Sequence, residues 1–339
     1  MNIPESKLKF ITFTFVPFII VYGLYFSLLN FYIYPHYNLF SARALLKKAY
    51  LDTSTPAEVD YLIIGDSSGM YSINPLVLSE NSFNMANVAQ TAYFTYKKLL
   101  SNPNLKINKG IIITQTFIPD HYNDDVWSVL IPIGEMDLFD VFKMYCHESD
   151  ESCTFGKKLE LTTKYFSHKL FLNSQALSDL AKFISKYPID NHHDKLNYFR
   201  KFIKENHGHY SSPVFAKTNL DEIEVSWKRN FSSSINNFPV SEKTYLNLIA
   251  KWAQNKKVPL FFFITPLANC VYPQFDTSEY TKSIKNILSQ IDIPQKRIVN
   301  SQNFKKLFIE EDFVDINHIN EDGARKNTLA LKNVLVTSD

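Results

Sequence analysis

Residues 10–34 form a long apolar and aromatic run near the amino terminus that contains no charged side chain. A run of this length is what a helix needs to cross the hydrocarbon core of a bilayer. Lys7 and Lys9 precede it, and the positive-inside rule then puts residues 1–9 in the cytoplasm and the rest of the chain outside. The length of the run, and its distance from the Ala-Arg-Ala sequence at residues 42–44, favour an anchor over a cleaved signal peptide. The sequence therefore predicts a single-pass protein of the inner membrane with a periplasmic or other extracytoplasmic domain.

The composition of the chain is that of an ordered protein and not of a nucleic-acid-binding one. Its 339 residues carry a formal net charge of +2, with Lys and Arg spread along the sequence, so no basic surface for a polyanion is expected. The 28 Phe and 19 Tyr residues, against 8 Gly residues, suit an ordered chain with a lipid-facing or sugar-facing surface. The length allows one large α/β domain with an insertion, or two small domains.

Three cysteines, Cys146, Cys153 and Cys270, are too few for a disulfide scaffold. In an exported domain the close pair Cys146 and Cys153 would meet the oxidising conditions that permit a bridge. Because sequence spacing alone does not establish bridging geometry, one local disulfide and three unpaired thiols remain as alternatives.

The order of the apolar segments predicts an α/β domain over residues 59–339. Residues 59–64 and 110–114 are compact apolar runs of the kind found in buried parallel strands. Residues 91–100 between them have helical spacing, and strand, helix, strand is the order of a βαβ unit. Further helices are expected at residues 242–254, 278–291 and 321–334, the last with Asn320 as its N-cap, and further strands at residues 258–265 and 297–300.

A linker is expected between the membrane run and this domain, over residues 35–58. Residues 38–50 have helical apolar spacing, with Arg43, Lys47 and Lys48 on the remaining face. This pattern is typical of an amphipathic helix that lies at a membrane interface. The segment is therefore predicted to be a juxtamembrane helix.

Residues 119–240 loosen into aromatic-rich, helix-like pieces without strand alternation, which indicates a helical insertion. The aromatic residues predict either a sugar-stacking groove or, as the simpler interpretation, an ordinary hydrophobic mini-core. The imidazole and carboxylate groups of the insertion lack the ligand spacing of a known metal site, which favours a solvated loop. These groups are His192, His193, Asp194, His207 and His209.

The sharpest local pattern is the sequence Gly-Asp-Ser-Ser-Gly at residues 65–69, directly after the first expected strand. A tight turn there lifts the hydroxyl of Ser67 above the sheet and leaves backbone N–H groups to face an oxyanion, as an acyl-transfer nucleophile requires. The pattern also satisfies the G-x-S-x-G elbow of α/β-hydrolases. That fold needs sheet strands upstream, whereas only the anchor and the linker precede Ser67. Asp66 is expected to brace the turn and not to carry a proton.

A second pattern, Asp315 and His318, stands in a loop just before the last expected helix. A carboxylate three residues before an imidazole can fold back to accept one ring N–H, which leaves the other ring nitrogen to face a serine. A neutral serine is a poor nucleophile at pH 7, so it needs such a base within hydrogen-bond reach. Either pattern alone is common in turns and caps, but the two together predict a triad of Ser67, Asp315 and His318.

The strand followed by Gly65, Asp66 and Ser67, with Asp315 and His318 near the other end, resembles the SGNH, or GDSL-like, hydrolase superfamily. With the membrane segment in front, the chain is similar to the exported acyl-transfer group that includes the DltD-like proteins of teichoic acid D-alanylation and the acetyltransferases of alginate assembly. The resemblance runs from about residue 59 to the carboxyl terminus, interrupted by the insertion. It implies a three-layer α/β/α, flavodoxin-like parallel sheet, with Ser67 as nucleophile, His318 as general base and Asp315 as its orienting partner.

The chain departs from the family where the oxyanion hole is normally built. In the family, the second sequence motif supplies a Gly to the oxyanion hole and the third supplies an Asn. In this chain residues 84–90 have Ala where that Gly is expected, and residues 114–116 lack the Gly-x-Asn-Asp sequence. The exported acyl-transfer members of the family also vary in these two motifs, so the departures favour that subgroup. Asn87 and Gln115 are the candidate oxyanion donors.

These patterns predict an exported serine enzyme that moves an acetyl or related acyl group onto a cell-envelope glycan through an acyl-Ser67 intermediate. The acyl group is expected to come from a membrane-bound O-acyltransferase partner, and the chemistry needs no cofactor and no metal. Water as the final acceptor would make the same site a carbohydrate esterase. The alternative from another class is a catalytically inert protein that holds glycan in an SGNH-like cleft.

Overall fold

A five-stranded sheet with all neighbouring strands parallel forms the centre of the structure, in the order β2-β1-β3-β4-β5. The central strands are runs of Ile, Leu and Phe, which are typical of parallel strands that are buried on both faces. The strands are β1 (Glu58–Gly65), β2 (Phe83–Asn84), β3 (Lys106–Thr114), β4 (Leu260–Ile264) and β5 (Ile298–Asn300).

The structure is a computed structural model of the chain. The residues that it describes are 16–17, 20–21, 23–24, 39–88, 90–114, 131, 136–146, 153–169, 190–210, 240–268, 286, 288–291, 297–315 and 317–337.

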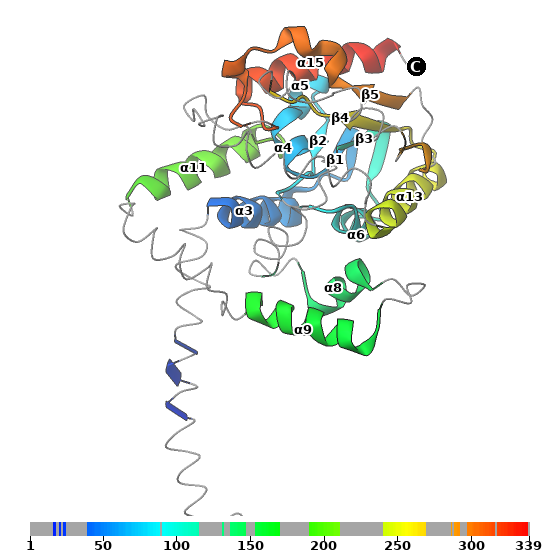
Figure 1. The fold of residues 1–339 in the computed structure, drawn as a ribbon. Helices are drawn as coiled ribbons and strands as arrows, with labels where there is room; N and C mark the ends of the chain where they lie inside the picture. Colours follow the sequence, from blue (N-terminus) through cyan, green and yellow to red (C-terminus); the bar gives the residue numbers. More distant parts are fainter. Residues whose placement is uncertain are drawn as a thin grey trace, which may run out of the picture.

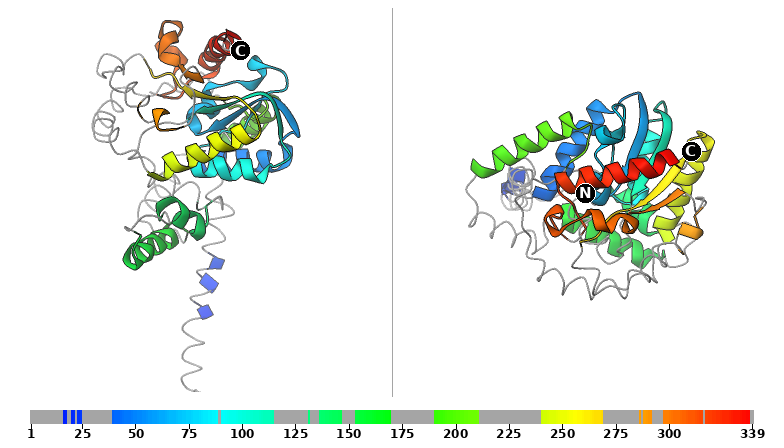
Figure 2. Two further views of the ribbon diagram at one scale, coloured as in Figure 1. Left: turned by 90° about the vertical axis from the view of Figure 1, so that its right-hand side faces the viewer. Right: turned by 90° about the horizontal axis from the view of Figure 1, so that it is seen from above.

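The side chains of the central strands alternate between two hydrophobic cores, one on each face of the sheet. Ile63 and Phe263 face a core that includes residues of α4, α5 and α15. Leu62 and Phe262 face the other core, which includes residues of α6 and α13. The sheet is therefore covered by helices on both faces (Figures 1 and 2). These helices are α4 (Ser67–Ser72), α5 (Pro75–Leu78), α6 (Ala92–Ser101), α13 (Val240–Asn255) and α15 (Glu321–Thr337).

Most of the predicted elements of the domain are confirmed, with bounds that differ by a few residues. They are the strands β1, β3, β4 and β5 and the helices α6, α13 and α15. Asn320 caps α15 as expected, because its side-chain oxygen accepts the N–H of Gly323 at 3.0 Å. Most of the helix expected at residues 278–291 lies outside the described residues.

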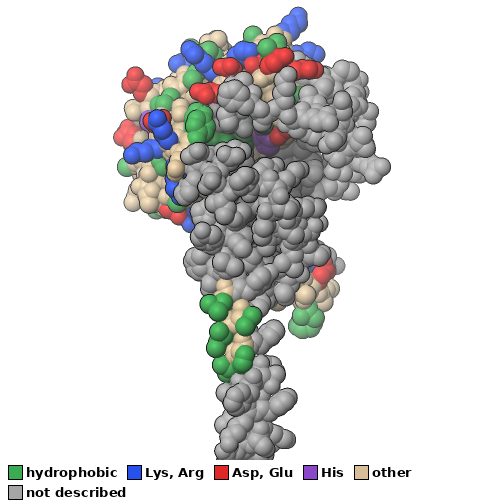
Figure 3. Space-filling view, turned by 90° about the vertical axis from the view of Figure 1, so that its left-hand side faces the viewer, with side chains coloured by type: hydrophobic (Ala, Val, Ile, Leu, Met, Phe, Trp, Pro, Cys, Tyr) green, Lys and Arg blue, Asp and Glu red, His purple; other side chains and the backbone are tan. Residues whose placement is uncertain are grey.

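The N-terminal apolar run is described only in short helical pieces, residues 16–17, 20–21 and 23–24. Among the described residues, no helix is long and apolar enough to cross a membrane. The apolar side chains in these pieces are exposed, and Figure 3 shows the pieces, which we call the N-terminal stem, below the domain. The rest of the predicted transmembrane helix, and the tail before it, lie outside the described residues.

The predicted juxtamembrane helix exists as α3 (Leu39–Ser54), but one of its faces is packed against the domain. The assignment of Lys47 to the polar face is wrong, since this side chain is completely buried. Its Nζ donates to the carbonyl oxygen of Asn84 at 2.6 Å and to that of Gly208. Burial, and then the charge of Lys98, hold the pKa of Lys47 well below its usual range.

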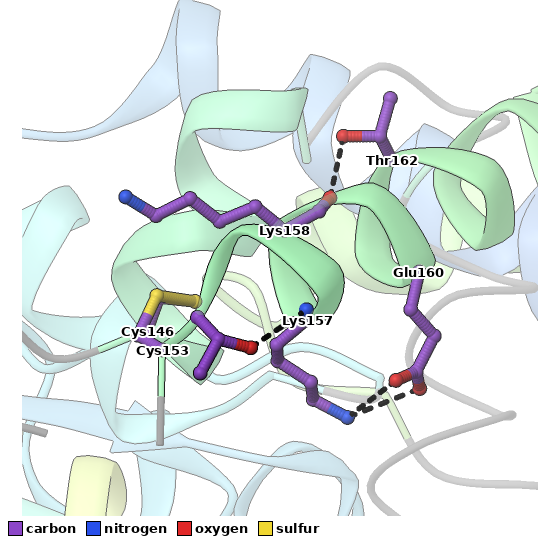
Figure 4. The surroundings of a disulfide bond; sticks show 7 residues. Cys146, Cys153, Lys157, Lys158, Glu160 and Thr162 are labelled. Atoms are coloured by element: carbon purple, nitrogen blue, oxygen red, sulfur yellow. Dashed lines mark hydrogen bonds and ion pairs between the residues drawn. A yellow bond between two sulfur atoms is a disulfide. The ribbon is translucent and has the colours of Figure 1, made fainter. Parts of the chain in front are cut away.

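The described parts of the insertion are helical, as expected: α8 (Leu138–Tyr145), α9 (Phe155–Lys169) and α11 (Asp190–Glu205). A disulfide joins Cys146, at the end of α8, to Cys153, two residues before α9, with their Cα atoms 5.0 Å apart (Figure 4). The alternative of three free thiols is thus excluded for this pair, while Cys270 lies outside the described residues. Asp140 of α8 is buried and accepts hydrogen bonds from Tyr93 and Lys97 of α6, which ties the hairpin to the domain.

Candidate active site

Ser67 stands at the point where the first sheet strand turns into a helix. β1 ends at Gly65, Asp66 is the N-cap of α4, and Ser67 is the first residue of that helix. The side chain of Asp66 accepts the backbone N–H of Ser68 at 3.0 Å and also the Ser68 hydroxyl. Asp66 therefore braces the turn, which is the position in which a helix N-cap carboxylate normally acts.

Steric contacts explain why Gly65 and Gly69 of the motif are glycines. Gly65 has a φ of +129°, and a Cβ atom there would stand 1.8 Å from the carbonyl oxygen of Thr114 on β3. A Cβ atom on Gly69 would stand 2.0 Å from the hydroxyl oxygen of the same threonine. Only glycine lets the end of β1 and the first turn of α4 approach β3 this closely.

Asp315 and His318 lie in a tight loop that leads into α15. An antiparallel bridge between Phe313 and Ile319 closes the loop, and the N–H of Val314 donates to the carbonyl oxygen of His318 at 2.8 Å. One carboxylate oxygen of Asp315, Oδ1, accepts the backbone N–H groups of Asn317 at 3.0 Å and of His318 at 2.9 Å. The backbone therefore fixes the orientation of this carboxylate.

The loop brings Asp315 and His318 into line with Ser67, although His318 and Ser67 are 251 residues apart in the sequence. His318 Nδ1 lies 2.7 Å from Asp315 Oδ2, and His318 Nε2 lies 2.8 Å from Ser67 Oγ. The side chains of His318 and Asp315 are 15% and 29% exposed, so the site can be reached from solvent. Both distances are within hydrogen-bond reach, which a nucleophile, a base and an orienting group would require.

The electrostatics of Asp315 suit its place in this chain of hydrogen bonds. Burial acts to raise its pKa, but the charge and hydrogen bond of His318 and the two backbone N–H donors outweigh burial, so the pKa lies below its usual value. Asp315 is thus an ionised acceptor at neutral pH. When Asp315 accepts the hydrogen bond from Nδ1–H, Nε2 is left as the acceptor for the Ser67 hydroxyl.

Tyr71, which the sequence motifs do not include, holds the imidazole from the side. Its ring centroid lies 4.6 Å from that of His318, and the Tyr71 side chain is 3% exposed. Tyr210, from the insertion, packs edge-on against Tyr71 with ring centroids 5.3 Å apart. The only sequence signal for Tyr71 is its position one helical turn after Ser67 on α4.

Helix α15 links the loop that carries His318 to α4, the helix that begins with Ser67. Asn327 donates from its side chain to the carbonyl oxygen of Ser72, the last residue of α4, at 2.8 Å. Thr328 accepts the backbone N–H of Asn74 at 3.0 Å. Because α15 starts three residues after His318, these bonds hold the base-bearing loop and α4 as one unit.

Of the two predicted oxyanion donors, only Asn87 is among the described residues, and Gln115 lies outside them. Asn87 is 2% exposed, and its backbone N–H donates to the carbonyl oxygen of Gly65 at 3.1 Å. Its side-chain oxygen accepts the N–H of Val88 at 2.8 Å. The structure thus places Asn87 beside the end of β1, next to the turn that carries Ser67.

Glu242 is a buried carboxyl group near the same turn that the sequence motifs do not reveal. It lies on α13, is 3% exposed, and accepts the backbone N–H of Ala92, the first residue of α6, at 3.0 Å. Burial, and to a smaller extent the charge of Asp66, raise the pKa of Glu242 to about 7 against the effect of the Ala92 bond. The partners are 150 residues apart, so no local pattern predicts the contact.

Glu242 predicts a dependence of stability on pH. Its pKa is about 7 in the folded protein against an ordinary value of 4.5. The folded state therefore binds more protons between these values, so the free energy of unfolding falls as pH rises through this window. Glu242→Gln removes this term. Relative to the variant, the wild type should lose about 2–3 kcal/mol between pH 4.5 and pH 8, measured by urea unfolding.

The matched control for this experiment is Glu160→Gln, at an exposed carboxylate on α9. This variant should follow the wild type at both pH values, because exposed charges contribute little. If Glu242→Gln also follows the wild type at both pH values, Glu242 does not titrate in this window.

The prediction of a solvated loop for the histidines of the insertion is wrong, because His192 and His193 belong to helix α11 and His209 is buried. His209 is completely buried, and its Nδ1 lies 3.0 Å from the carbonyl oxygen of Met70 on α4. Burial, followed by the charge of Lys47, lowers the pKa of His209 to about 3. In the part of the chain that the structure describes, no group of three or more potential ligand residues could hold a metal ion.

Comparisons with known proteins give no family for this chain. No protein-family model matches it, and no curated protein matches it. The function therefore has to be inferred from the geometry of Ser67, Asp315 and His318 and from the surroundings of these residues.

Proposed function

We propose that this protein is an SGNH-type serine acyl-transfer enzyme, in which Ser67 carries the acyl group. The observation that carries the proposal is the continuous hydrogen-bonded series from Asp315 through His318 to Ser67, with distances of 2.7 Å and 2.8 Å. We further propose that the enzyme moves an acetyl or related acyl group onto or off a cell-envelope glycan.

In the first half-reaction the hydroxyl proton of Ser67 passes to His318 Nε2 as Oγ attacks the acyl carbonyl carbon. Asp315 stabilises the imidazolium that results and keeps the ring in its orientation. The tetrahedral intermediate then collapses, the bond to the leaving alcohol breaks, and that alcohol takes the proton from Nε2. An acyl ester on Ser67 remains.

In the second half-reaction an acceptor hydroxyl gives its proton to Nε2 and attacks the same carbonyl carbon. The bond from that carbon to Oγ then breaks, and Oγ takes the proton from Nε2, which regenerates the Ser67 hydroxyl. A glycan hydroxyl as acceptor makes the enzyme an O-acyltransferase, and water makes it an esterase. Both outcomes use the same three residues and differ in what excludes water from the site.

The oxyanion in both half-reactions needs hydrogen-bond donors. Ser67 is the first residue of α4, and an N–H at the start of a helix has no acceptor within the helix. The side-chain NH₂ of Asn87, held beside the end of β1, is the proposed second donor. The loss of one oxyanion donor typically lowers kcat by about 10²-fold to 10³-fold. Catalysis is therefore still possible in a chain that lacks the family's usual oxyanion residues.

The topology supports the SGNH assignment within this proposal. The strand order β2-β1-β3-β4-β5 is the flavodoxin-like order of doubly wound sheets. Ligand sites in such folds lie outside the carboxyl ends of the strands, and Ser67 follows the carboxyl end of β1. The base directly precedes the last helix, as the resemblance implies.

The apolar N-terminal run and the disulfide support a location outside the cytoplasm. The Cys146–Cys153 bridge would persist in an oxidising compartment and is unusual in a cytosolic protein. Residues 10–34 are proposed to anchor the chain in the inner membrane, and a membrane-bound O-acyltransferase is the proposed source of the acyl group.

The test is covalent labelling of the purified protein with a fluorophosphonate, together with hydrolysis of a chromogenic acetyl ester. The wild type should gain the mass of one phosphonyl group on Ser67 and should turn over the ester, and Ser67→Ala should do neither. Ser101→Ala, an exposed serine on α6, should behave as the wild type. Absence of both labelling and Ser67-dependent turnover would favour an inert protein that holds glycan in the same cleft.

A deletion strain separates the two enzyme reactions. Loss of O-acyl groups from the surface polysaccharide, measured by NMR of the purified glycan, indicates the transferase. An increase in O-acyl groups indicates the esterase.

A further inference from the structure

We propose that the disulfide-linked hairpin of α8 and α9 docks on the surface of a bilayer that contains anionic lipid. The proposal builds on the membrane anchor of the proposed function, but it does not depend on the chemistry at Ser67. It rests on three observations: an exposed apolar stripe, the lysines beside that stripe, and the position of the hairpin relative to the N-terminal run.

The outer face of α9 carries an apolar stripe. Phe155, Leu159 and Phe166 are 83%, 57% and 46% exposed. Their spacing of four and seven residues puts them on one side of a helix. Leu161 and Tyr165, which are buried, attach the opposite side of the helix to the domain core. The exposed stripe is therefore not needed to hold α9 in place.

The lysines around the stripe are arranged as in helices that lie at a membrane interface. Lys158 is exposed on α9 beside Phe155 and Leu159. On α8, Phe139 is 63% exposed, and the Nζ of Lys143 lies 4.6 Å from its ring centroid. Phe and Leu at the acyl boundary, with Lys at the level of the headgroups, favour a surface that contains anionic lipid.

The hairpin lies on the same side of the sheet as the N-terminal stem. Two views show α8 and α9 below the sheet, in the direction in which the described N-terminal turns extend (Figures 1 and 2). Val21 and Leu24 in those turns are 66% and 67% exposed. A bilayer spanned by this segment would thus face the hairpin, which makes lipid the occupant that the geometry favours over a soluble partner.

The disulfide links the two helices of the hairpin at one end. Cys146 and Cys153 connect the end of α8 to the start of α9. The bridge thus holds the end of α8, the helix that carries Phe139, close to the start of α9, the helix that carries the stripe. With the hairpin docked, the protein would touch the bilayer at a second point besides its anchor. This contact would limit rotation of the domain about the anchor and hold the active site at a constant height above the membrane.

The test uses the full chain reconstituted in vesicles of phosphatidylcholine and phosphatidylglycerol. A fluorescent amino acid replaces Leu159, or Val21 in the stem, or Leu329, which is 48% exposed on α15. Lipids with a quencher at the top of the acyl chain probe positions 159 and 329, and lipids with a quencher near the end of the acyl chain probe position 21, which lies near the middle of the proposed span. Quenching at position 159 should exceed that at position 329 by about threefold or more, as expected for a side chain buried at the acyl boundary.

The charged lipid component is tested separately. Lys158→Glu, or vesicles without phosphatidylglycerol, should reduce quenching at position 159 and leave position 21 unchanged.

The outcomes separate this proposal from the anchor. Quenching at position 21 together with equal, low values at positions 159 and 329 would overturn the docking and keep the anchor. Absence of quenching at position 21 would overturn the anchor, and position 159 would then report on the hairpin alone. Photo-crosslinking from position 159 to a second copy of the chain in the same vesicles would show a protein occupant instead of lipid and would equally overturn the proposal.

Discussion

Asp315→Asn is expected to lower the kcat of ester hydrolysis by about 10⁴-fold, the loss known for the corresponding change in a chymotrypsin-type triad. Ser67 and His318 both remain in this variant, and so does the shape of residue 315. The loss therefore measures what the carboxylate does for the imidazole.

The physical reason is the way in which the new amide has to lie. Oδ1 of Asp315 accepts two backbone N–H groups, from Asn317 and His318. In the variant the amide oxygen takes that position, because an NH₂ group cannot accept. The NH₂ then faces Nδ1 of His318 and forces the ring proton onto Nε2. His318 would point a donor at Ser67 and could not remove its proton.

The matched control is Asp322→Asn, which makes the same chemical change at an exposed carboxylate four residues after His318. Its kcat should equal that of the wild type, and thermal unfolding should show that Asp315→Asn is folded. The decisive measurement is the steady-state rate with a chromogenic acetyl ester across pH 5 to 9. A kcat within about tenfold of the wild type would mean that Asp315 does not act through His318.

Three of the four strands that the sequence predicted share one property, which is burial on both faces at their carboxyl ends. β1, β3 and β4 are runs of large apolar residues that a parallel sheet with helices on both sides requires. β2 was beyond prediction because it has two residues, one of which is the polar Asn84. Asn84 is buried there because its side chain donates to the carbonyl oxygens of Gly69 and Ile73 and accepts the N–H of Ala86. Only the tertiary structure supplies those partners.

The burial of Lys47 was missed for the same reason. Helical periodicity places a lysine on a polar face, since an unpaired buried cation is costly. In the structure two carbonyl oxygens, of Asn84 and Gly208, stand 37 and 161 residues away and compensate the ammonium group. No local sequence pattern predicts such a contact.

In the candidate site, the motif residues were predictable and their surroundings were not. Ser67 is marked by its glycines, and Asp315 and His318 by their mutual spacing, so each half of the proposed triad is a local pattern. The contacts of Tyr71, Glu242 and Asn327 are made by side chains whose local sequence is that of ordinary helices. Tyr71 meets His318, Asn327 meets the end of α4, and Glu242 meets the start of α6 only after the chain has folded around the sheet.

Gly65→Ala is expected to produce the largest loss of stability, about 3–5 kcal/mol, from strain of the backbone and overpacking together. The native φ of +129° is one that alanine rarely adopts, and the new Cβ would meet the Thr114 carbonyl oxygen at 1.8 Å. That contact is to the backbone of the neighbouring strand, so no side-chain rotation relieves it. Either β1 separates from β3 at its carboxyl end or the turn opens, and Ser67 is displaced in both cases.

Gly156→Ala is the matched control, because a Cβ atom at Gly156 meets nothing closer than 3.8 Å. It lies in the first turn of α9, where alanine should be neutral or should stabilise the protein by up to about 0.5 kcal/mol. Urea unfolding followed by circular dichroism compares both variants with the wild type. If Gly65→Ala unfolds within about 1 kcal/mol of the wild type and is labelled at Ser67, the turn has relaxed around the new atom. The close approach of β1 and β3 at Thr114 would then not be what requires glycine in the nucleophile turn.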